Sequence, residues 1–268
     1  MQPVTVQNGQ SPLILAMPHG GTYVPADIFV KLNDNGKILA DTDWHIDRVY
    51  QDLAPDVTIV KASFHRYVID ANRDPKGMSL YPGQNTTNLC PLTDFDGKDI
   101  WQPNQQPTLD EINRRADKFH APYHQALSEQ IERVKAIHGY AILFDCHSIR
   151  SKIPFLFAGE LPTFNIGTND GQTCTSIIET VTVDICQAAE NYTSVLNGRF
   201  KGGWTTRHYG QPDDGVHAIQ MEISQAAYMQ EYPEWDYLPD VATKVRPHLA
   251  KILKSLIELN LPMHSKGH

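Results

Sequence analysis

Two short apolar runs, each followed at once by a polar segment that carries a histidine, constrain this chain most. Residues 140–144 read Tyr-Ala-Ile-Leu-Phe and precede Asp-Cys-His-Ser at 145–148. Residues 13–17 read Leu-Ile-Leu-Ala-Met and precede Pro-His-Gly-Gly at 18–21. Such runs are typical of strands buried on both faces of a parallel sheet. Because ligands bind beyond the carboxyl ends of these strands, the two runs predict that His19 and His147 meet at one rim.

Strands and helices alternate along the rest of the chain. Thr108 and Glu111 form a capping box at the start of a long helix, which Pro122 should kink or break in two. The alternation predicts an α/β fold with three layers, α/β/α, around a mixed, mainly parallel sheet. Strands are expected at 12–17, 57–62, 66–70, 140–145, 154–157 and 217–223, and helices at 41–53, 108–137, 170–189 and 239–259.

Size and composition favour a single soluble domain over residues 1–268. The chain has 268 residues, of which 41% are hydrophobic, and a net charge of -8, which weighs against nucleic acid or an anionic membrane as partner. No basic-then-apolar N-terminal segment and no run of about 20 apolar residues stands out. The four cysteines lack metal-site spacing, so we expect reduced core residues and a cytoplasmic location. The tail 263–268 is expected to be disordered, and a monomer or a small homo-oligomer both remain open.

The two histidines predict a metal site. A catalytic zinc usually takes three protein ligands, often two histidines and a carboxylate. The third ligand is expected within 41–47, where Asp43 lies in the first turn of a predicted helix and can face the rim. Asp41 reads as the cap of that helix. Two other residues of this segment could contribute. His45 is a rival metal ligand, and Asp47 could hydrogen-bond a ligating histidine and fix its tautomer. Asp145 is expected to face away from His147.

Two irregular segments and an arginine-rich stretch predict an anion site. Residues 74–106 and 197–215 are rich in glycine, proline and asparagine, and long loops of this kind usually cover a functional site. Between 65 and 75, Arg66 and Arg73 flank a predicted strand, with Asn72 beside the second. Arginine binds carboxylates in a planar fork, so an anionic ligand is expected there.

An ordered series of segments gives the chain a family resemblance. It is similar to N-formylglutamate amidohydrolases of bacterial histidine degradation, from about residue 12 to 230. The resemblance rests on Pro-His-Gly-Gly-Thr at 18–22, Asp-Thr-Asp-Trp-His-Ile-Asp-Arg at 41–48, Arg-Tyr-Val-Ile-Asp-Ala-Asn-Arg-Asp-Pro at 66–75, Asp-Cys-His-Ser-Ile-Arg-Ser at 145–151, Phe-Asn-Ile-Gly-Thr at 164–168, Asn-Gly-Arg-Phe-Lys-Gly-Gly at 197–203, Thr-Arg-His-Tyr-Gly at 206–210 and His-Ala-Ile-Gln-Met-Glu-Ile at 217–223.

The resemblance implies a zinc-carboxypeptidase-like fold and a metal-dependent amidohydrolase. The implied reaction is hydrolysis of N-formyl-L-glutamate to formate and L-glutamate, with one divalent metal, expected to be zinc. Relatives among the carboxypeptidases carry a glutamate ligand three residues after the first histidine, but Thr22 stands there, so Asp43 is the expected third ligand. Glu222 would be the general base and acid, and Arg66 would stabilise the oxyanion.

The implied substrate is a small dicarboxylate, so two cationic clamps are expected. Asn72 and Arg73 would bind one carboxylate, and Arg207 or Arg150 the other. Rival readings are an aspartoacylase-like or carboxypeptidase-like deacylase, a nucleophilic hydrolase using Ser148 or Cys146, and a non-enzymatic anion-binding protein.

Overall fold

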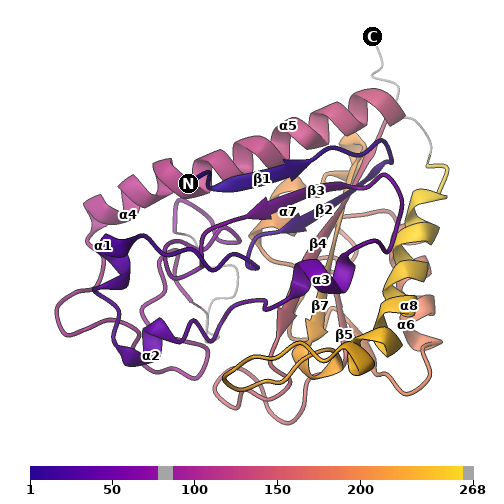
Figure 1. Cartoon of the computed structure of the whole chain (residues 1–268). Helices are drawn as coiled ribbons and strands as arrows, with labels where there is room; N and C mark the ends of the chain where they lie inside the picture. Colours follow the sequence, from indigo (N-terminus) through magenta and orange to yellow (C-terminus); the bar gives the residue numbers. More distant parts are fainter. Residues whose placement is uncertain (78–86, 262–268) are drawn as a thin grey trace.

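The structure is a computed structural model that describes residues 1–77 and 87–261. Their seven strands form one sheet in the order β1-β3-β2-β4-β7-β5-β6 (Figure 1). The central strands β3, β2, β4 and β7 run parallel, whereas β1 pairs antiparallel with β3 and β5 with β7. The strands are β1 (Val4–Gln7), β2 (Leu13–Met17), β3 (Thr58–Ala62), β4 (Ala141–Ile149), β5 (Phe164–Gly167), β6 (Ser194–Leu196) and β7 (Val216–Ser224).

Helices cover both faces of this sheet, so the predicted three-layer α/β/α architecture is confirmed (Figure 1). One face carries α4 (Leu109–Arg115), a π-helical turn (Ala116–His120), α5 (Ala121–His138) and α7 (Trp204–Tyr209). The other carries α3 (Ile46–Tyr50), α6 (Ser176–Gln187) and α8 (Pro239–Ile257). Short helices α1 (Ala26–Phe29) and α2 (Asp34–Lys37) lie outside the layers, and 3-10 turns occur at Pro212–Asp214 and Gln225–Ala227. None of the helices in the described ranges combines the length and apolar character that a membrane crossing requires.

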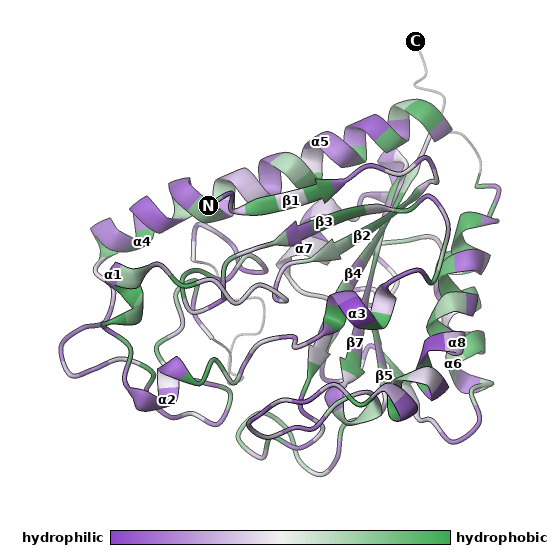
Figure 2. Ribbon diagram, in the orientation of Figure 1, coloured by the Kyte–Doolittle hydropathy of each residue, from purple (hydrophilic) through white to green (hydrophobic). Residues whose placement is uncertain are grey.

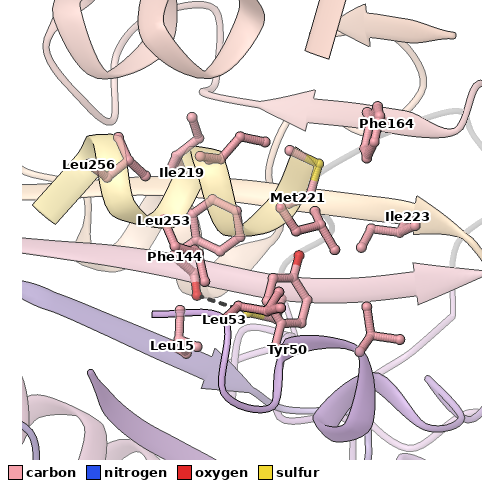
Figure 3. Close-up of a cluster of buried hydrophobic side chains, with 14 of the residues drawn as sticks. Leu15, Tyr50, Leu53, Phe144, Phe164, Ile219, Met221, Ile223, Leu253 and Leu256 are labelled. Carbon is pink, nitrogen blue, oxygen red and sulfur yellow. Dashed lines mark hydrogen bonds between the residues drawn. The ribbon is translucent and has the colours of Figure 1, made fainter. Parts of the chain in front are cut away.

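Each sheet face is packed by an apolar core, and the helices present one apolar side to it (Figure 2). In β4, Phe144 points toward the α8 layer and contacts Tyr50 with ring centroids 5.9 Å apart (Figure 3). Burying one such large apolar side chain contributes about 1.5–3 kcal/mol. On the opposite face, Leu143 is apolar but Asp145 and His147 are polar. Both faces of the sheet are therefore apolar over most of their area, and the α5 face becomes polar toward the carboxyl ends of β4 and β7.

Four of the six predicted strands are confirmed as β2, β3, β4 and β7. The prediction at 66–70 is wrong: Tyr67 and Val68 are buried outside any strand, and their carbonyls accept hydrogen bonds from Arg115. The prediction at 154–157 is also wrong, because these residues form a turn in which Phe157 N donates to Ile153 O at 3.0 Å. Apolar alternation reports burial, and a buried loop can produce it as well as a strand. Strands β1, β5 and β6 were not predicted, since each has only three or four residues.

The predicted helices exist but most are shorter than expected. The helix at 41–53 is only α3, because His45 has a positive φ of 59° that ends any helical path into it. The helix at 170–189 begins at Ser176, since Asn169, Asp170 and Gly171 all have positive φ. The predicted long helix is divided near Pro122: a π-helical turn at Ala116–His120 separates α4 from α5, in whose first turn the proline lies. The tail 263–268 lies outside the described residues, as does part of the irregular segment 74–106.

Candidate functional site

Three neighbouring strands deliver the polar residues of the site. His19 lies just after β2, and His147 lies within β4, where it pairs in register with Glu222 of β7. The rings of His19 and His147 have centroids 4.9 Å apart, and all three side chains are buried. The structure therefore brings the two histidines together as the strand pattern predicted. Glu222 joins them because β7 lies directly beside β4.

Asp43 completes a buried group of three metal-ligand side chains. Its Oδ2 lies 3.1 Å from His147 Nδ1 and 3.9 Å from His19 Nδ1, and one ligand atom from each residue falls within 4.8 Å of the others. Atoms that share a tetrahedral shell with bonds of about 2.0–2.2 Å lie roughly 3–4 Å apart. These residues therefore fit a single divalent ion. Two imidazoles and a carboxylate suit zinc, and also cobalt, manganese or iron.

The turn before α3 decides which acidic residue of segment 41–47 reaches this group. Asp43 N donates to His19 O at 3.1 Å, and Ser148 N donates to Asp43 Oδ2 at 3.1 Å, so this turn is tied to both strand ends. The other three candidates have partners elsewhere. Asp41 Oδ2 accepts from Phe95 N at 3.0 Å, His45 Nε2 bonds Trp235 O at 2.7 Å, and Asp47 pairs with Lys61 at 2.8 Å. The interpretation of Asp41 as a helix cap is wrong, because α3 begins only after His45.

A carboxylate fixes the orientation of His19. Asp70 Oδ1 lies 2.7 Å from His19 Nε2, which leaves Nδ1 facing Asp43. The same carboxylate pairs with Arg66 at 2.5 Å and accepts from Asn72 N at 2.8 Å. Burial acts to raise the pKa of Asp70, but the charges of Arg66 and other neighbours hold that pKa well below its usual range. Carboxylates behind metal-binding histidines set ring orientation and basicity, a role that sequence reasoning did not assign to Asp70.

His147 is held from the side opposite Asp43. Its Nε2 lies 3.0 Å from Asn72 Nδ2 and 3.2 Å from Asp145 Oδ1. The expectation that Asp145 faces away is therefore wrong: β4 continues to Ile149, and residues two apart in a strand share a face. Burial acts to lower the pKa of His147, but Asp145 and Asp43 outweigh it and hold the pKa well above its usual value. Since a ligating histidine must be neutral, a metal ion bound at His147 would compete with a proton.

Glu222 has the environment of a proton-exchanging group. It is buried, and Gln220 Nε2 donates to its Oε2 at 3.4 Å. Burial raises the pKa of the Glu222 carboxyl to about 8, against the opposing charges of His147 and Arg66. A carboxyl that titrates near neutral pH can both accept and return a proton during turnover.

A cavity opens over this group, with an empty volume of about 650 Å³ that includes its mouth. Seven of the predicted site residues line it: His19, Asp43, Arg66, Asn72, Arg73, His147 and Glu222. The irregular segments supply further lining residues, namely Thr87 and Phe95 from the first and Arg199, Phe200 and Gly203 from the second. A Cβ at Gly203 would lie 2.3 Å from Asn72 Nδ2, so only glycine allows this approach. Both segments therefore contribute to the walls of the cavity.

Two predicted clamp residues lie outside the lining. Arg150 Nη2 pairs with Asp96 at 3.2 Å, and Arg207 Nε donates to Gly202 O at 2.9 Å. Arg199 lines the cavity instead, and sequence reasoning assigned it no role although it falls within the segment 197–203 that carries the family resemblance.

The two candidate nucleophiles, Cys146 and Ser148, make their contacts with groups other than the His147 ring. Cys146 points into the core on the α8 side, where burial raises the pKa of its thiol well above the usual value. Ser148 Oγ accepts a hydrogen bond from Tyr228 OH at 2.6 Å. The ring nitrogens of His147 contact Asp43, Asn72 and Asp145. This arrangement favours metal-assisted chemistry over a serine or cysteine nucleophile.

Replacing Asp70 with Asn should weaken metal binding by about 10–100-fold, because losing the hydrogen-bond partner of a metal-ligating histidine typically has an effect of this size. The amide cannot carry the charge that balances Arg66, and it does not fix the His19 ring in the same way. Titration of the metal-free protein with zinc measures the effect, with Asp213→Asn, at an exposed position, as the control. Unchanged zinc affinity in Asp70→Asn would contradict this role.

Comparisons with known proteins show which family this chain belongs to. A family model described as N-formylglutamate amidohydrolase matches residues 11–229. An N-formylglutamate deformylase of Pseudomonas aeruginosa is 42% identical over 95% of this chain and 96% of its own length, and one of Pseudomonas putida is 39% identical over 95% of each. A crystal structure of N-formylglutamate amidohydrolase from Ralstonia eutropha aligns with a TM-score of 0.77 and 25% identity over 96% of this chain and 98% of that one. A gene product of Agrobacterium tumefaciens, 19% identical, shares the fold with a TM-score of 0.70 over 96% of this chain and 97% of that one.

Proposed function

Because the chain belongs to the N-formylglutamate amidohydrolase family, we propose that it hydrolyses N-formyl-L-glutamate to formate and L-glutamate. The observation that carries the proposal is the buried group of His19, Asp43 and His147 beside Glu222, in a cavity that arginines also line. The whole chain would act as a single catalytic domain. Its four cysteines are buried free thiols, which supports a cytoplasmic location. A role in histidine degradation is what the family resemblance implies.

His19, Asp43 and His147 would hold one divalent ion, with zinc the ion we propose. When bound, such an ion supplies a Lewis acid and lowers the pKa of water. Asp70 would keep the His19 imidazole oriented, and Asn72 and Asp145 that of His147, since in both rings Nε2 makes these contacts while Nδ1 faces Asp43.

Glu222 would carry the proton through the reaction. Its carboxylate takes a proton from the attacking water as the water oxygen bonds to the formyl carbon. It then gives that proton to the amide nitrogen as the C–N bond breaks, so formate and the free amine leave. The guanidinium of Arg66, which has an Nη1 3.4 Å from His19 Nδ1, would stabilise the negative charge that develops on the formyl oxygen.

Arg73 would bind one substrate carboxylate at the cavity wall. Its Nε donates to Thr87 O at 3.0 Å and its Nη1 to Asn72 O at 2.9 Å, so the guanidinium is held in one orientation. Asn72 itself contacts His147 through Nδ2 and accepts from Thr205 N through Oδ1 at 2.8 Å. Asn72 would therefore serve mainly to connect the clamp to the metal group.

A side-by-side assay tests the proposed function. The purified protein should release formate from N-formyl-L-glutamate with a kcat/KM at least about tenfold above its kcat/KM for N-acetyl-L-glutamate, because the acetyl methyl must fit beside a buried polar group. Peptides ending in glutamate should react more slowly still. Faster hydrolysis of the acetyl or peptidyl compound would instead favour an aspartoacylase-like or carboxypeptidase-like enzyme.

A further inference from the structure

Arg199 enters the cavity from a loop that is fixed at both ends. On one side, Asn197 Oδ1 accepts from Thr168 N at 2.9 Å and its Nδ2 donates to Thr168 Oγ1 at 2.8 Å. On the other, Lys201 O accepts from Asn169 N at 2.6 Å. The loop between β6 and α7 is thus tied to the end of β5. Such anchoring positions the Arg199 side chain before a ligand arrives.

The Arg199 guanidinium is also oriented by its own contacts. Its Nε donates to Leu156 O at 3.1 Å, and its central carbon lies 5.5 Å from the centroid of the Phe200 ring. Leu156 and Phe200, together with Phe95 and Ile149, form the apolar part of the lining. Methylene groups of a substrate side chain would find an apolar wall here, with a cation next to it.

The charges of the lining are unusual for a chain with a net charge of -8. Three arginines, Arg66, Arg73 and Arg199, face two carboxylates, Asp43 and Glu222. Arg66 and Arg73 both lie beside the Asp70 carboxylate, at 2.5 and 3.8 Å, and so belong to one cluster near His19. Arg199 comes from a separate segment of the chain. It contacts Leu156 O and the Phe200 ring, whereas the Asp70 carboxylate holds the other two, so the cavity has a cation outside the Asp70 cluster, which suits a ligand with two carboxylates.

We infer that Arg199 binds the side-chain carboxylate of the substrate and so selects acidic N-formyl amino acids over neutral ones. This inference rests on the proposed function and assigns the α-carboxylate to Arg73. It places the second clamp at Arg199 because Arg150 and Arg207, the other candidates, lie outside the lining of the cavity. Arg199 would be a specificity residue that takes no part in the proton transfers.

The test compares two substrates of nearly equal size, N-formyl-L-glutamate and the uncharged N-formyl-L-glutamine. In Arg199→Gln, kcat/KM for the glutamate compound should fall about 30-fold or more, the lower end of what loss of a desolvated charge partner costs. The value for the glutamine compound should stay within about threefold, since no charge pair is lost there. The change should lie mainly in KM. Arg199→Lys should recover part of the loss, because it keeps the charge but not the planar fork.

Retained activity on N-formyl-L-glutamine would show that Arg199→Gln is folded. Arg114→Gln makes the same chemical change at an exposed position and is the matched control for loss of one positive charge. An equal loss on both substrates in both Arg199 variants would overturn the assignment, as would an unchanged preference in Arg199→Gln. Collapse of the preference in Arg150→Gln or Arg207→Gln, with Arg199→Gln unaffected, would move the clamp to that residue. If the wild-type protein released no formate from either compound, the proposed function itself would fail. An active wild type with an unaffected Arg199→Gln would overturn only the present inference.

Discussion

Replacement of Glu222 by Gln is expected to lower kcat for N-formyl-L-glutamate by about 10²–10⁴-fold, the range that a positioned general acid–base contributes. Gln has nearly the same shape, so the packing around β7 and the contact with Gln220 should persist. It can neither take a proton from water nor return one to the leaving nitrogen. The bound metal should remain, because Glu222 is not one of the three grouped ligands.

Steady-state kinetics together with metal analysis by mass spectrometry separate these two effects. Glu190→Gln makes the same chemical change at an exposed position and serves as the control. Loss of activity accompanied by loss of metal would mean that Glu222 helps to hold the ion. A kcat within about tenfold of the wild type, with metal intact, would rule out the proton-transfer role.

Replacement of His147 by Ala should remove stoichiometric metal and lower activity by roughly 10³-fold or more, since a bound ion supplies several kcal/mol of transition-state stabilisation. His147 contributes one of only two imidazoles to the group, and its loss leaves Asp43 buried with fewer partners. Treatment of the wild-type protein with a chelator should produce a similar loss, and zinc should restore the wild type but not the variant.

The rise in unfolding temperature on adding zinc offers a measurement that does not depend on activity. An ion that binds only the folded protein stabilises it in proportion to the logarithm of its concentration over Kd. The wild type should show this rise and His147→Ala should not. The rival ligand His45, which bonds Trp235 O, supplies the comparison. If His45→Ala lost the metal and His147→Ala retained it, the proposed ligand set would be wrong.

The convergence of His19 and His147 could be predicted because it depends on a local rule. Each follows or ends an apolar run, and adjacent parallel strands end at one rim of a sheet. From the sequence, the third metal ligand could be placed within segment 41–47 but not assigned to one residue of it. The choice among Asp41, Asp43 and His45 depends on the turn that precedes α3, including the left-handed conformation of His45. The turn is held by long-range contacts, from Asp43 to His19 and Ser148 and from His45 to Trp235, and local propensity does not contain these.

The misplaced face of Asp145 comes from an error in residue spacing. The expectation treats Asp145 and His147 as adjacent strand residues, which would point to opposite faces, but they are two positions apart in β4, which continues to Ile149, and so share one face. The strand continues because β7 pairs with it through to Ser224. Asp145 lies under α7, where Thr206 Oγ1 donates to its Oδ2 at 3.0 Å, whereas His147 and Glu222 line the cavity.

The sequence alone determined the layered α/β architecture, the two histidines and the family, because alternating apolar runs and short motifs are properties of neighbouring residues. The tertiary structure alone decided that Asp70 orients His19, that Arg115 satisfies the carbonyls of a buried loop, and that Arg199 enters the cavity while Arg150 and Arg207 do not. The Asp70 and Arg115 contacts join residues 47 to 51 positions apart in the sequence. The loop that carries Arg199 follows β6 and is tied to the end of β5. They arise only when the sheet brings distant segments into contact, and no local pattern encodes which side chains then meet.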